Sequence, residues 1–486
     1  MDILEWKKKN GRPAGYAHFD KKLGLKTKWN YVTNPKMVAQ HGFYPFIHYN
    51  QVFYKFSKKD GIKEKIRPIC YSAHIDRGIY KYYGYLLNEK YNEYTDKEGI
   101  SNSVVAYRTN LHKNNIHFAK QAFDFIKQQD CDIMVGDFTG FFDNLDHKYL
   151  KQMLCKVLNV QTLSEDWYAV FKNITKYSTW ELIDILEMNN LINNIHIKNI
   201  AHAHKEALGG KTKKARSYIR FINDKIKKLN EKELALSQTE FKLNVKRAAI
   251  PNEKSYGIPQ GSAISAVLSN VYMIEFDKKI FQYINSLNGL YLRYSDDFII
   301  VIPKNDEVTF EEIKKYLYEV VKGTQRVELE PGKTKIYSYS YSKILNISQI
   351  EQKYEDSIDY LGFVFDGKKI TLRPKTISKY YYRMYKKLNY IIKCKGITKK
   401  GNKISYNNLY RIYTQKGRNG EYDKALLPKK ELKVDKNNPY KDGNFFSYVY
   451  KADKIFNPKG IIHKEPITQS TKRHMLKIRR KRQKIT

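Results

Sequence analysis

The sequence has no long apolar run, few cysteines and a shortage of acidic residues. None of its 486 residues falls in an apolar stretch of about 18 residues, so no membrane-spanning helix is expected. The opening residues, MDILEWKKKNGRP, lack the apolar segment of a secretory signal. The 4 cysteines form no closely spaced pair, which argues against a structural zinc site or a disulfide framework. These absences together predict a cytoplasmic protein that does not enter a membrane.

The shortage of acidic residues leaves a large positive charge. Lys and Arg number 89 against 50 Asp and Glu, which gives a formal net charge of +39 at pH 7. Such a field favours a polyanionic partner, and nucleic acid is the commonest one. Compositional drift is the alternative explanation, although drift should raise Glu and Asp together with Lys.

Several segments show a clear secondary-structure pattern. Apolar residues recur at helical spacing in 74–94, 114–128, 310–321 and 376–393. A helix is expected near residue 145, with Asp143 or Asn144 as its N-cap. The segment 160–250 is long, helical in pattern and locally very basic, so we interpret it as an insertion. No tandem repeat is present.

Three aspartates stand where strands are expected to end. The apolar run 131–138 predicts a buried strand that delivers Asp137 at its end. Two apolar runs flank Asp296 and Asp297, which predicts a hairpin. Carboxylates that converge in this way can hold two Mg²⁺ ions for phosphoryl transfer. A solvated turn explains most isolated Asp-Asp pairs, but apolar strands on both sides make that alternative weaker here.

Six motifs in order then resemble those of reverse transcriptases of the group II intron, retron and bacterial defence type. The catalytic motifs are DFTGFFDNLDH (137–147), GIPQGSAIS (257–265) and YSDD (294–297). The later motifs are PGKTK (331–335) and YLGF (360–363), and KIRPI (65–69) with HIDR (74–77) resembles the fingers region. The resemblance runs from about residue 60 to about residue 375.

The resemblance implies an α+β fold, a right-hand polymerase with fingers and palm. On this basis we expect an N-terminal extension (1–60), fingers and palm (61–375, with a helical insertion at about 160–250), and a mainly helical, basic, thumb-like region (376–486). The C-terminal residues show neither zinc-ligand pairs nor an evident nuclease carboxylate set. That pattern and the insertion look most like the bacterial defence-associated enzymes, related to the abortive-infection group.

The resemblance also implies roles for particular residues. Asp137, Asp296 and Asp297 are the expected metal ligands, with help from the carbonyl of Phe138 and with Mg²⁺, or Mn²⁺ in its place, as the cofactor. Lys333 is a candidate general acid for pyrophosphate. Phe142 is a candidate gate against ribose, and the other expected nucleotide-binding residues are Lys65, Arg67, Arg108, Gln260 and Gly261. A core aromatic (Phe142) and surface charges (Arg67, Lys333) are the alternatives.

Basic segments outside these motifs are candidates for RNA contact. They contain Lys211, Lys213, Lys214 and Arg216 within 204–232, and Arg479, Arg480 and Arg482 within 474–486. Solvated helix faces or a disordered end are the alternatives. The tyrosines of 380–385 either stack on bases or form the buried face of a helix.

The leading interpretation is thus an RNA-directed or RNA-associated DNA polymerase that uses dNTPs. The resemblance implies work with a non-coding RNA in antiphage defence, a DNA product, and in some members a homo-oligomer. A retron or group II intron enzyme is a second hypothesis. A catalytically idle RNA-binding scaffold is a third, although three clustered carboxylates without metal would be costly to maintain.

Overall fold

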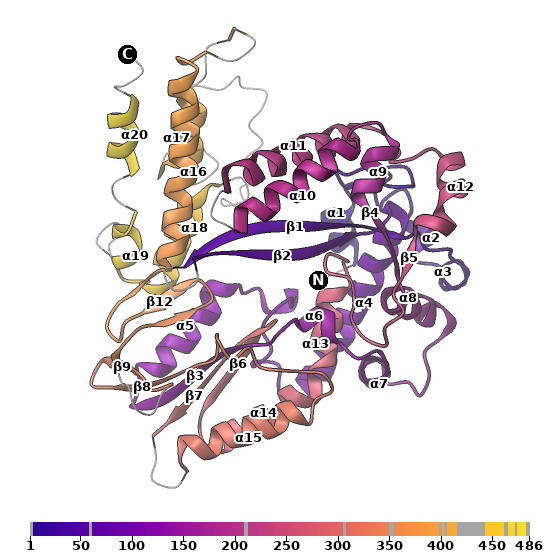
Figure 1. Cartoon of the computed structure of the whole chain (residues 1–486). Coiled ribbons are helices and arrows are strands. Elements are labelled where there is room, and N and C mark those ends of the chain that lie inside the picture. Colours follow the sequence, from indigo (N-terminus) through magenta and orange to yellow (C-terminus); the bar gives the residue numbers. More distant parts are fainter. Residues whose placement is uncertain are drawn as a thin grey trace.

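The computed structural model describes residues 3–57, 61–208, 212–304, 308–348, 354–397, 401–402, 406–415, 443–460, 465–471 and 474–482. It has the expected mixed α+β composition, with antiparallel sheets at its centre (Figure 1).

A six-stranded sheet forms the centre of the lower half of the molecule in Figure 1. Its order is β10-β9-β8-β3-β7-β6, and the central strand is β3 (Cys131–Asp137). The other strands are β6 (Leu290–Tyr294), β7 (Asp297–Pro303), β8 (Lys335–Ser340), β9 (Lys343–Asn346) and β10 (Tyr354–Glu355). Strand β3 pairs antiparallel with both β7 and β8.

The sheet is buried on both faces, which explains the continuous apolar runs in the sequence. One face contributes Met134 and Ile300 to a core shared with α14 (Ile274–Ser286) and α15 (Phe310–Lys322). The opposite face contributes Ile133 and Ile299 to a second core shared with α5 (Asn115–Ile126). Alternate residues of each strand therefore serve different cores.

A second sheet, of order β2-β1-β4-β5, crosses the middle of the molecule (Figure 1). Strands β1 (Phe46–Ser57) and β2 (Gly61–Tyr71) form a long antiparallel ribbon, and β4 (Ser178–Glu181) and β5 (Ile250–Pro251) extend it. The long helix α4 (His74–Lys97) follows β2 and buries Tyr80, Tyr83 and Leu87 in the main core. Short helices α1 (Ile3–Asn10), α2 (Trp29–Val32) and α3 (Pro35–Ala39) precede the ribbon.

The segment between Asp137 and the GIPQG loop is mainly helical among its described residues. It contains α6 (Phe141–Asn144), α7 (His147–Leu158), α8 (Glu165–Thr175), α9 (Leu182–Met188), α10 (Asn194–Leu208), α11 (Thr212–Glu231) and α12 (Gln238–Ala248). Helices α10 and α11 lie over the β1–β2 ribbon (Figure 1), where Ala203, Ala207 and Ala215 pack beside Tyr54.

The N-cap expected for the helix near residue 145 was wrong. Helix α7 begins at His147, and the Asp146 side chain accepts a hydrogen bond of 2.8 Å from the Tyr149 N–H. Asp143 and Asn144 instead belong to the short helix α6, which Gly140 starts in a left-handed conformation (φ 54°). The separate short helix shifts the cap by two to three positions.

The described C-terminal residues form a small sheet and a group of helices. Strands β11 (Ile358–Tyr360), β12 (Phe363–Phe365) and β13 (Ile370–Leu372) lead into α16 (Pro374–Lys393). Helices α17 (Tyr406–Tyr413), α18 (Phe445–Phe456), α19 (Pro466–Gln469) and α20 (His474–Arg482) follow. Met384 and Leu388 of α16 form a separate core with residues of α17, α18 and α20.

Within the described part of the chain, no helix has both the length and the apolarity needed to cross a bilayer.

Candidate active site

The register of the central sheet brings the expected aspartates together. Asp137, the last residue of β3, lies directly opposite Asp297, the first residue of β7. Residues directly opposite in an antiparallel pair present their side chains on the same face. Tyr294 pairs with Asp297 across the hairpin, so Ser295 and Asp296 form the connecting loop. We call residues 294–297 the aspartate turn.

Buried polar contacts hold the aspartate turn in place. Ser295 has a left-handed φ of 63°, an uncommon conformation for a residue with a Cβ. Its carbonyl accepts a hydrogen bond of 2.9 Å from Arg293, whose side chain is fully buried. Its hydroxyl oxygen accepts one of 3.1 Å from Tyr107. Phe138 N–H donates to the Asp296 carbonyl at 3.2 Å, which ties the end of β3 to the turn.

Arg293 is itself fixed by a buried carboxylate. Its Nε and Nη2 donate to Asp277 of α14 at 2.7 and 2.6 Å, and neither residue is exposed to solvent. Tyr291 donates a third hydrogen bond to Asp277 at 2.7 Å. This bidentate pair links helix α14 to the back of the aspartate turn.

Lys333 reaches the same site from the loop before β8. Its ammonium donates to Asp137 Oδ2 at 2.7 Å. Burial lowers the pKa of Lys333, but its hydrogen bond to Asp137 and the charges of Asp137, Glu330 and Asp296 outweigh this and raise the pKa overall. Burial, followed by the charges of Asp296 and Asp137, raises the pKa of Asp297 to about 6. The three carboxylates therefore act on one another electrostatically.

The donor chemistry of this site suits hard divalent cations, which prefer carboxylate oxygens. Among the described residues, however, no three His, Cys, Asp or Glu side chains are drawn together closely enough to form a metal site by themselves. The Lys333 ammonium forms an ion pair with Asp137 and so supplies positive charge beside this carboxylate. Burial raises the pKa of Asp297 most, and repulsion from Asp296 and Asp137 adds to the shift. A divalent cation would relieve that repulsion, so the residues fit such an ion.

The GIPQG loop contacts both the segment after β3 and the end of β2. Ile258 N–H donates to the Phe142 carbonyl at 3.0 Å, and Cys70 N–H donates to the Gln260 carbonyl at 2.8 Å. Gly261 has a φ of 113°, and a Cβ there would lie 2.4 Å from the Cys70 oxygen. Only glycine allows this close approach. The Gln260 amide donates to the Asp143 carboxylate at 3.2 Å, beside Phe142.

The other expected nucleotide-binding residues fall in different surroundings. Lys65 and Arg67 stand two residues apart on β2, so they share a face of the ribbon, and the Arg67 guanidinium lies 5.8 Å from the Phe53 ring centre. Phe142 is half-buried against Phe141 at the edge of the main core.

Arg108 is not on an open surface. Its guanidinium is buried and donates to Asn92 and to the Ser101 and Val104 carbonyls at 2.5–3.1 Å, joining α4 to the loop that follows it. This geometry assigns Arg108 a structural task and gives no support to its expected place in a nucleotide pocket.

The basic residues expected to contact RNA lie on two helices. Lys214 and Arg216 are exposed on α11, where Lys214 forms an ion pair with Glu206 at 3.2 Å. Arg479 and Arg480 are exposed on α20. Lys211 lies outside the described residues, and the side chains of Lys213 and Arg482 lie outside the described part of their helices.

Arg293 and Asp277 were not expected at this site, and Asp143 was expected only as a helix N-cap. A signal for Arg293 was present, because a cation inside the apolar run LYLRY must be paired if the strand is buried. The pairing of Asp277 with Arg293, and of Asp143 with Gln260, depends on residues that the fold brings together and leaves no local signal.

Residues 212–365 match the family model described as reverse transcriptase (RNA-dependent DNA polymerase). Among curated proteins no match is found. Among solved structures, apo telomerase from Candida tropicalis is similar over 77% of this chain and 57% of the telomerase chain, with 12% identity and a TM-score of 0.37. A C-terminally truncated form covers 72% and 60%, with 11% identity and a TM-score of 0.36. Telomerase from Candida albicans with a fragment of telomeric RNA covers 73% and 50%, with 13% identity and a TM-score of 0.35.

The chain thus spans 50–60% of the length of these telomerase structures, and similarities this distant do not bear on function. The family match is more informative, because it includes the GIPQG loop, the aspartate turn and Lys333. Asp137 lies upstream of the matched residues and joins them through the register of β3 and β7. Residues 212–365 of the chain therefore correspond to a reverse transcriptase domain.

Proposed function

We propose that this chain is an RNA-directed DNA polymerase that extends a 3′-hydroxyl with deoxynucleotides at Asp137, Asp296 and Asp297. The observation that carries the proposal is the register that sets Asp137 opposite Asp297, with Asp296 in the adjoining loop. Three carboxylates on one edge of a rigid sheet are suited to two-metal phosphoryl transfer.

Asp137 and Asp296 would be the principal residues to hold two Mg²⁺ ions, and Asp297 and the carbonyl of Phe138 would be weaker ligands. Such ions, when bound, lower the pKa of the attacking hydroxyl and neutralise the triphosphate. The 3′-oxygen forms a bond to the α-phosphorus while the bond to pyrophosphate breaks. Lys333, which donates a hydrogen bond to Asp137, is the proposed general acid that gives a proton to the departing pyrophosphate.

The surrounding residues position the nucleotide. Lys65 and Arg67 on one face of the β1–β2 ribbon supply positive charge for the triphosphate, where an Arg fork suits phosphate oxygens. Gln260 and the backbone of Gly261 face the base, with the Gln260 amide held by Asp143. Phe142, whose carbonyl anchors the GIPQG loop, is the proposed barrier to a ribose 2′-hydroxyl.

The partner RNA and the biological setting are part of the proposal. The motifs and the helical insertion resemble bacterial defence-associated reverse transcriptases, so we propose a bound non-coding RNA and a role against phage. The net charge of +39 supports a nucleic-acid partner but does not distinguish one RNA from another. Loss of phage protection on Asp296→Asn substitution would support this setting, and unchanged protection would contradict it.

Polymerisation by the purified protein with its co-purifying RNA tests the activity. Mg²⁺ with four dNTPs should yield DNA, four rNTPs should yield no product, and Asp296→Asn should reduce synthesis at least 100-fold, as expected when a metal ligand is lost. Asp124→Asn is the matched control and should leave the rate unchanged, because Asp124 is a half-exposed carboxylate on α5 that pairs with Lys120. Incorporation of rNTPs would contradict the proposed role of Phe142 as a barrier to the ribose 2′-hydroxyl. Synthesis that survives Asp296→Asn would exclude the proposed site.

A further inference from the structure

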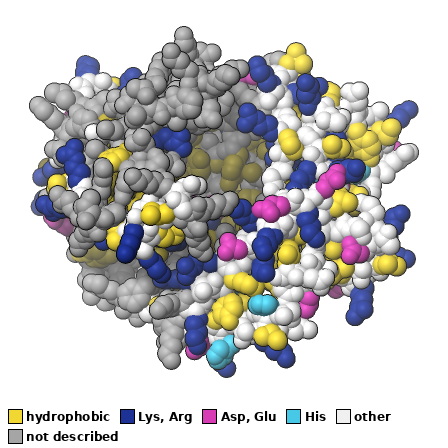
Figure 2. Space-filling view, turned by 90° about the horizontal axis from the view of Figure 1, so that it is seen from above, with side chains coloured by type: hydrophobic (Ala, Val, Ile, Leu, Met, Phe, Trp, Pro, Cys, Tyr) yellow, Lys and Arg dark blue, Asp and Glu magenta, His cyan; other side chains and the backbone are white. Residues whose placement is uncertain are grey.

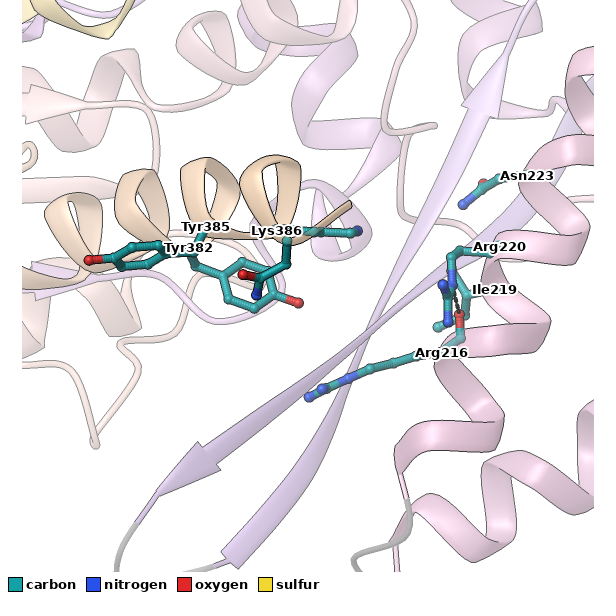
Figure 3. A pocket seen from close by; sticks show the side chains of 8 residues that line it. Arg216, Ile219, Arg220, Asn223, Tyr382, Tyr385 and Lys386 are labelled. Carbon is teal, nitrogen blue, oxygen red and sulfur yellow. Dashed lines mark hydrogen bonds between the residues drawn. The ribbon is translucent and has the colours of Figure 1, made fainter. Parts of the chain in front are cut away.

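A groove of about 740 Å³ lies between the insertion and the C-terminal helices. Residues of α11 form one wall and residues of α16 form the other, although the two helices are more than 140 residues apart in the sequence. Figure 1 shows the two helices on either side of the space above the β1–β2 ribbon, and Figure 3 shows the lining side chains. The proposed polymerase chemistry assigns no role to this groove.

The α16 wall presents aromatic and basic side chains at the spacing of one helix face. Tyr382, Tyr385, Lys386 and Asn389 follow the i, i+3, i+4, i+7 pattern. Tyr382 is 62% exposed, whereas Met384 and Leu388 on the other side of the helix are fully buried. The core of the C-terminal helices therefore fixes the direction in which the tyrosines point.

The α11 wall repeats the same spacing with Arg216, Ile219, Arg220 and Asn223. Arg216 and Arg220 are exposed, and Figure 3 shows the Arg216 side chain extending from α11 toward α16. Arg220 Nε donates to the Arg216 carbonyl at 3.2 Å, which orients its guanidinium along the helix. Behind this wall, Ala215 is buried against α10 and Tyr54 of β1, and Leu229 is buried in a core that includes the N-terminal segment and β1.

The charge of the groove has one sign. None of the eight described residues that line it is acidic, and helix α16 contains no Asp or Glu. Figure 2 shows Lys and Arg side chains distributed over the described surface on this side of the molecule. The ring of Tyr385 is half-buried against the core of the C-terminal helices, whereas Tyr382 is exposed. A groove with cations on both walls and these two rings on one is suited to a phosphodiester chain whose bases are free to stack.

We propose that this groove binds a single-stranded segment of nucleic acid, with Arg216, Arg220 and Lys386 on the phosphates and Tyr382 and Tyr385 against the bases. Bases in a closed duplex do not expose their faces to such rings, so a single strand is the better fit. RNA and DNA share this chemistry. The inference deepens the proposed function, because the groove would hold the unpaired part of a template or product.

The test measures the affinity of the RNA-free full chain for 5′-labelled 12-nucleotide oligomers of U or dT, by fluorescence anisotropy over a range of salt concentrations. The groove variant is Arg220→Ala with Lys386→Ala. The matched control is Lys228→Ala with Lys387→Ala, which removes the same charge from the same two helices at exposed positions outside the groove. Tyr382→Ala tests stacking separately.

The groove variant should weaken binding at least tenfold and reduce the salt slope by about 1.4, since each phosphate contact with a single strand contributes about 0.7. The control variant should change the Kd by less than threefold and leave the slope intact. Tyr382→Ala should weaken binding at least fivefold at every salt concentration. Equal effects of the groove and control variants, or tighter binding of a 12-base-pair duplex, would overturn the proposal. Comparison of U and dT oligomers shows which strand is preferred.

This binding assay contains no dNTP and no divalent metal, so it fails or succeeds independently of polymerisation. If the wild-type chain makes no DNA but binds oligomers through the groove, only the proposed function fails. If DNA synthesis is intact while the groove and control variants bind equally, only the groove proposal fails.

Discussion

Arg293 is paired with Asp277 and also donates a hydrogen bond to the aspartate turn. Both side chains are buried, and two hydrogen bonds of 2.6–2.7 Å join them. A buried ion pair is weak evidence for stability, because desolvation opposes the attraction between the charges. The hydrogen bond from Arg293 to the Ser295 carbonyl indicates that the pair positions the aspartate turn. It holds a residue with a left-handed backbone next to two of the three aspartates.

A double-mutant cycle separates positioning from stability. Arg293→Met and Asp277→Leu should each lower the free energy of unfolding by about 3–5 kcal/mol, because each leaves the other charge buried and unpaired. The double variant should regain at least half of that loss in urea unfolding, whereas its DNA synthesis should stay as low as in Arg293→Met. Recovery of both quantities together would show that the pair does not position the turn.

The exposed pair Arg373–Asp359 provides the control for this cycle. Its side chains are 39% and 47% exposed, so breaking it with Asp359→Asn should change the free energy of unfolding by less than about 1 kcal/mol. A large effect there would mean that the assay reports something other than burial of charge.

Among the elements, those with strong patterns could be predicted from the sequence. The helices α4, α5, α15 and α16 and the strands β3, β6 and β7 lie where hydrophobic periodicity places them, within a few residues. The proximity of Asp137 to Asp297 follows, because an apolar strand and an apolar hairpin of similar length pair in the central sheet. The catalytic roles of these residues stay predictions.

Other elements carry no such signal. Strand β1 was missed because much of its surface is exposed, so FIHYNQVFYKFS contains no continuous apolar run, and only its pairing with β2 over 11 residues reveals it. The groove between α11 and α16 was also beyond prediction. Each helix shows a basic face locally, but their opposition depends on how the whole chain folds.

Helix α16 packs in a small core of its own, separate from the cores of the central sheet. Leu388 is fully buried in the small core that α16 forms with α17, α18 and α20. Leu388→Ala should destabilise this helical group by about 2–5 kcal/mol, by lost burial and a cavity. Because the central sheet has its own cores, the loss of stability should be confined to this helical group. Native-state hydrogen exchange should show faster exchange in 374–393 and unchanged exchange in β3 and β7.

The same variant should weaken binding of the single-stranded oligomer, since α16 forms one wall of the groove. Lys387→Ala, next to Leu388 but exposed, is the control and should alter neither exchange nor binding. Faster exchange in β3 as well would mean that the C-terminal helices and the central sheet unfold as one unit.

At the scale of the whole molecule, the N-terminal segment joins parts that are distant in sequence. Ala17 N–H donates to Asn230 at 3.0 Å, and Ala235 N–H donates to the His18 carbonyl at 2.7 Å, so this segment is tied to the insertion. His18 Nε2 donates to the Tyr71 carbonyl at the end of β2, at 3.2 Å. His18 is completely buried, and its Nδ1 has no hydrogen-bond partner among the residues that the structure describes.

This burial makes the stability of the protein depend on pH. Burial lowers the pKa of His18 to about 3; the charge of Asp20 opposes the shift and that of His74 adds to it. The unfolded chain binds a proton near pH 6.5, whereas the folded chain does not until about pH 3. Above pH 6.5 His18 is neutral in both states, so its titration does not change the free energy of unfolding. Between pH 6.5 and about pH 3 the free energy of unfolding falls by about 1.4 kcal/mol for each pH unit of acidification. A net charge already at +39 increases on acidification and adds general repulsion.

His18→Gln isolates the contribution of the histidine, because glutamine keeps a side-chain donor for the Tyr71 carbonyl and does not titrate. Whatever the packing cost at pH 7, the variant should gain about 2 kcal/mol relative to wild type between pH 7 and pH 5, measured by urea unfolding of RNA-free protein. The general repulsion and the titration of His74, whose pKa burial also lowers, remain in both proteins and cancel in the comparison. Parallel pH profiles would mean that His18 becomes protonated in the folded chain, and that the N-terminal segment opens well before the central sheet unfolds.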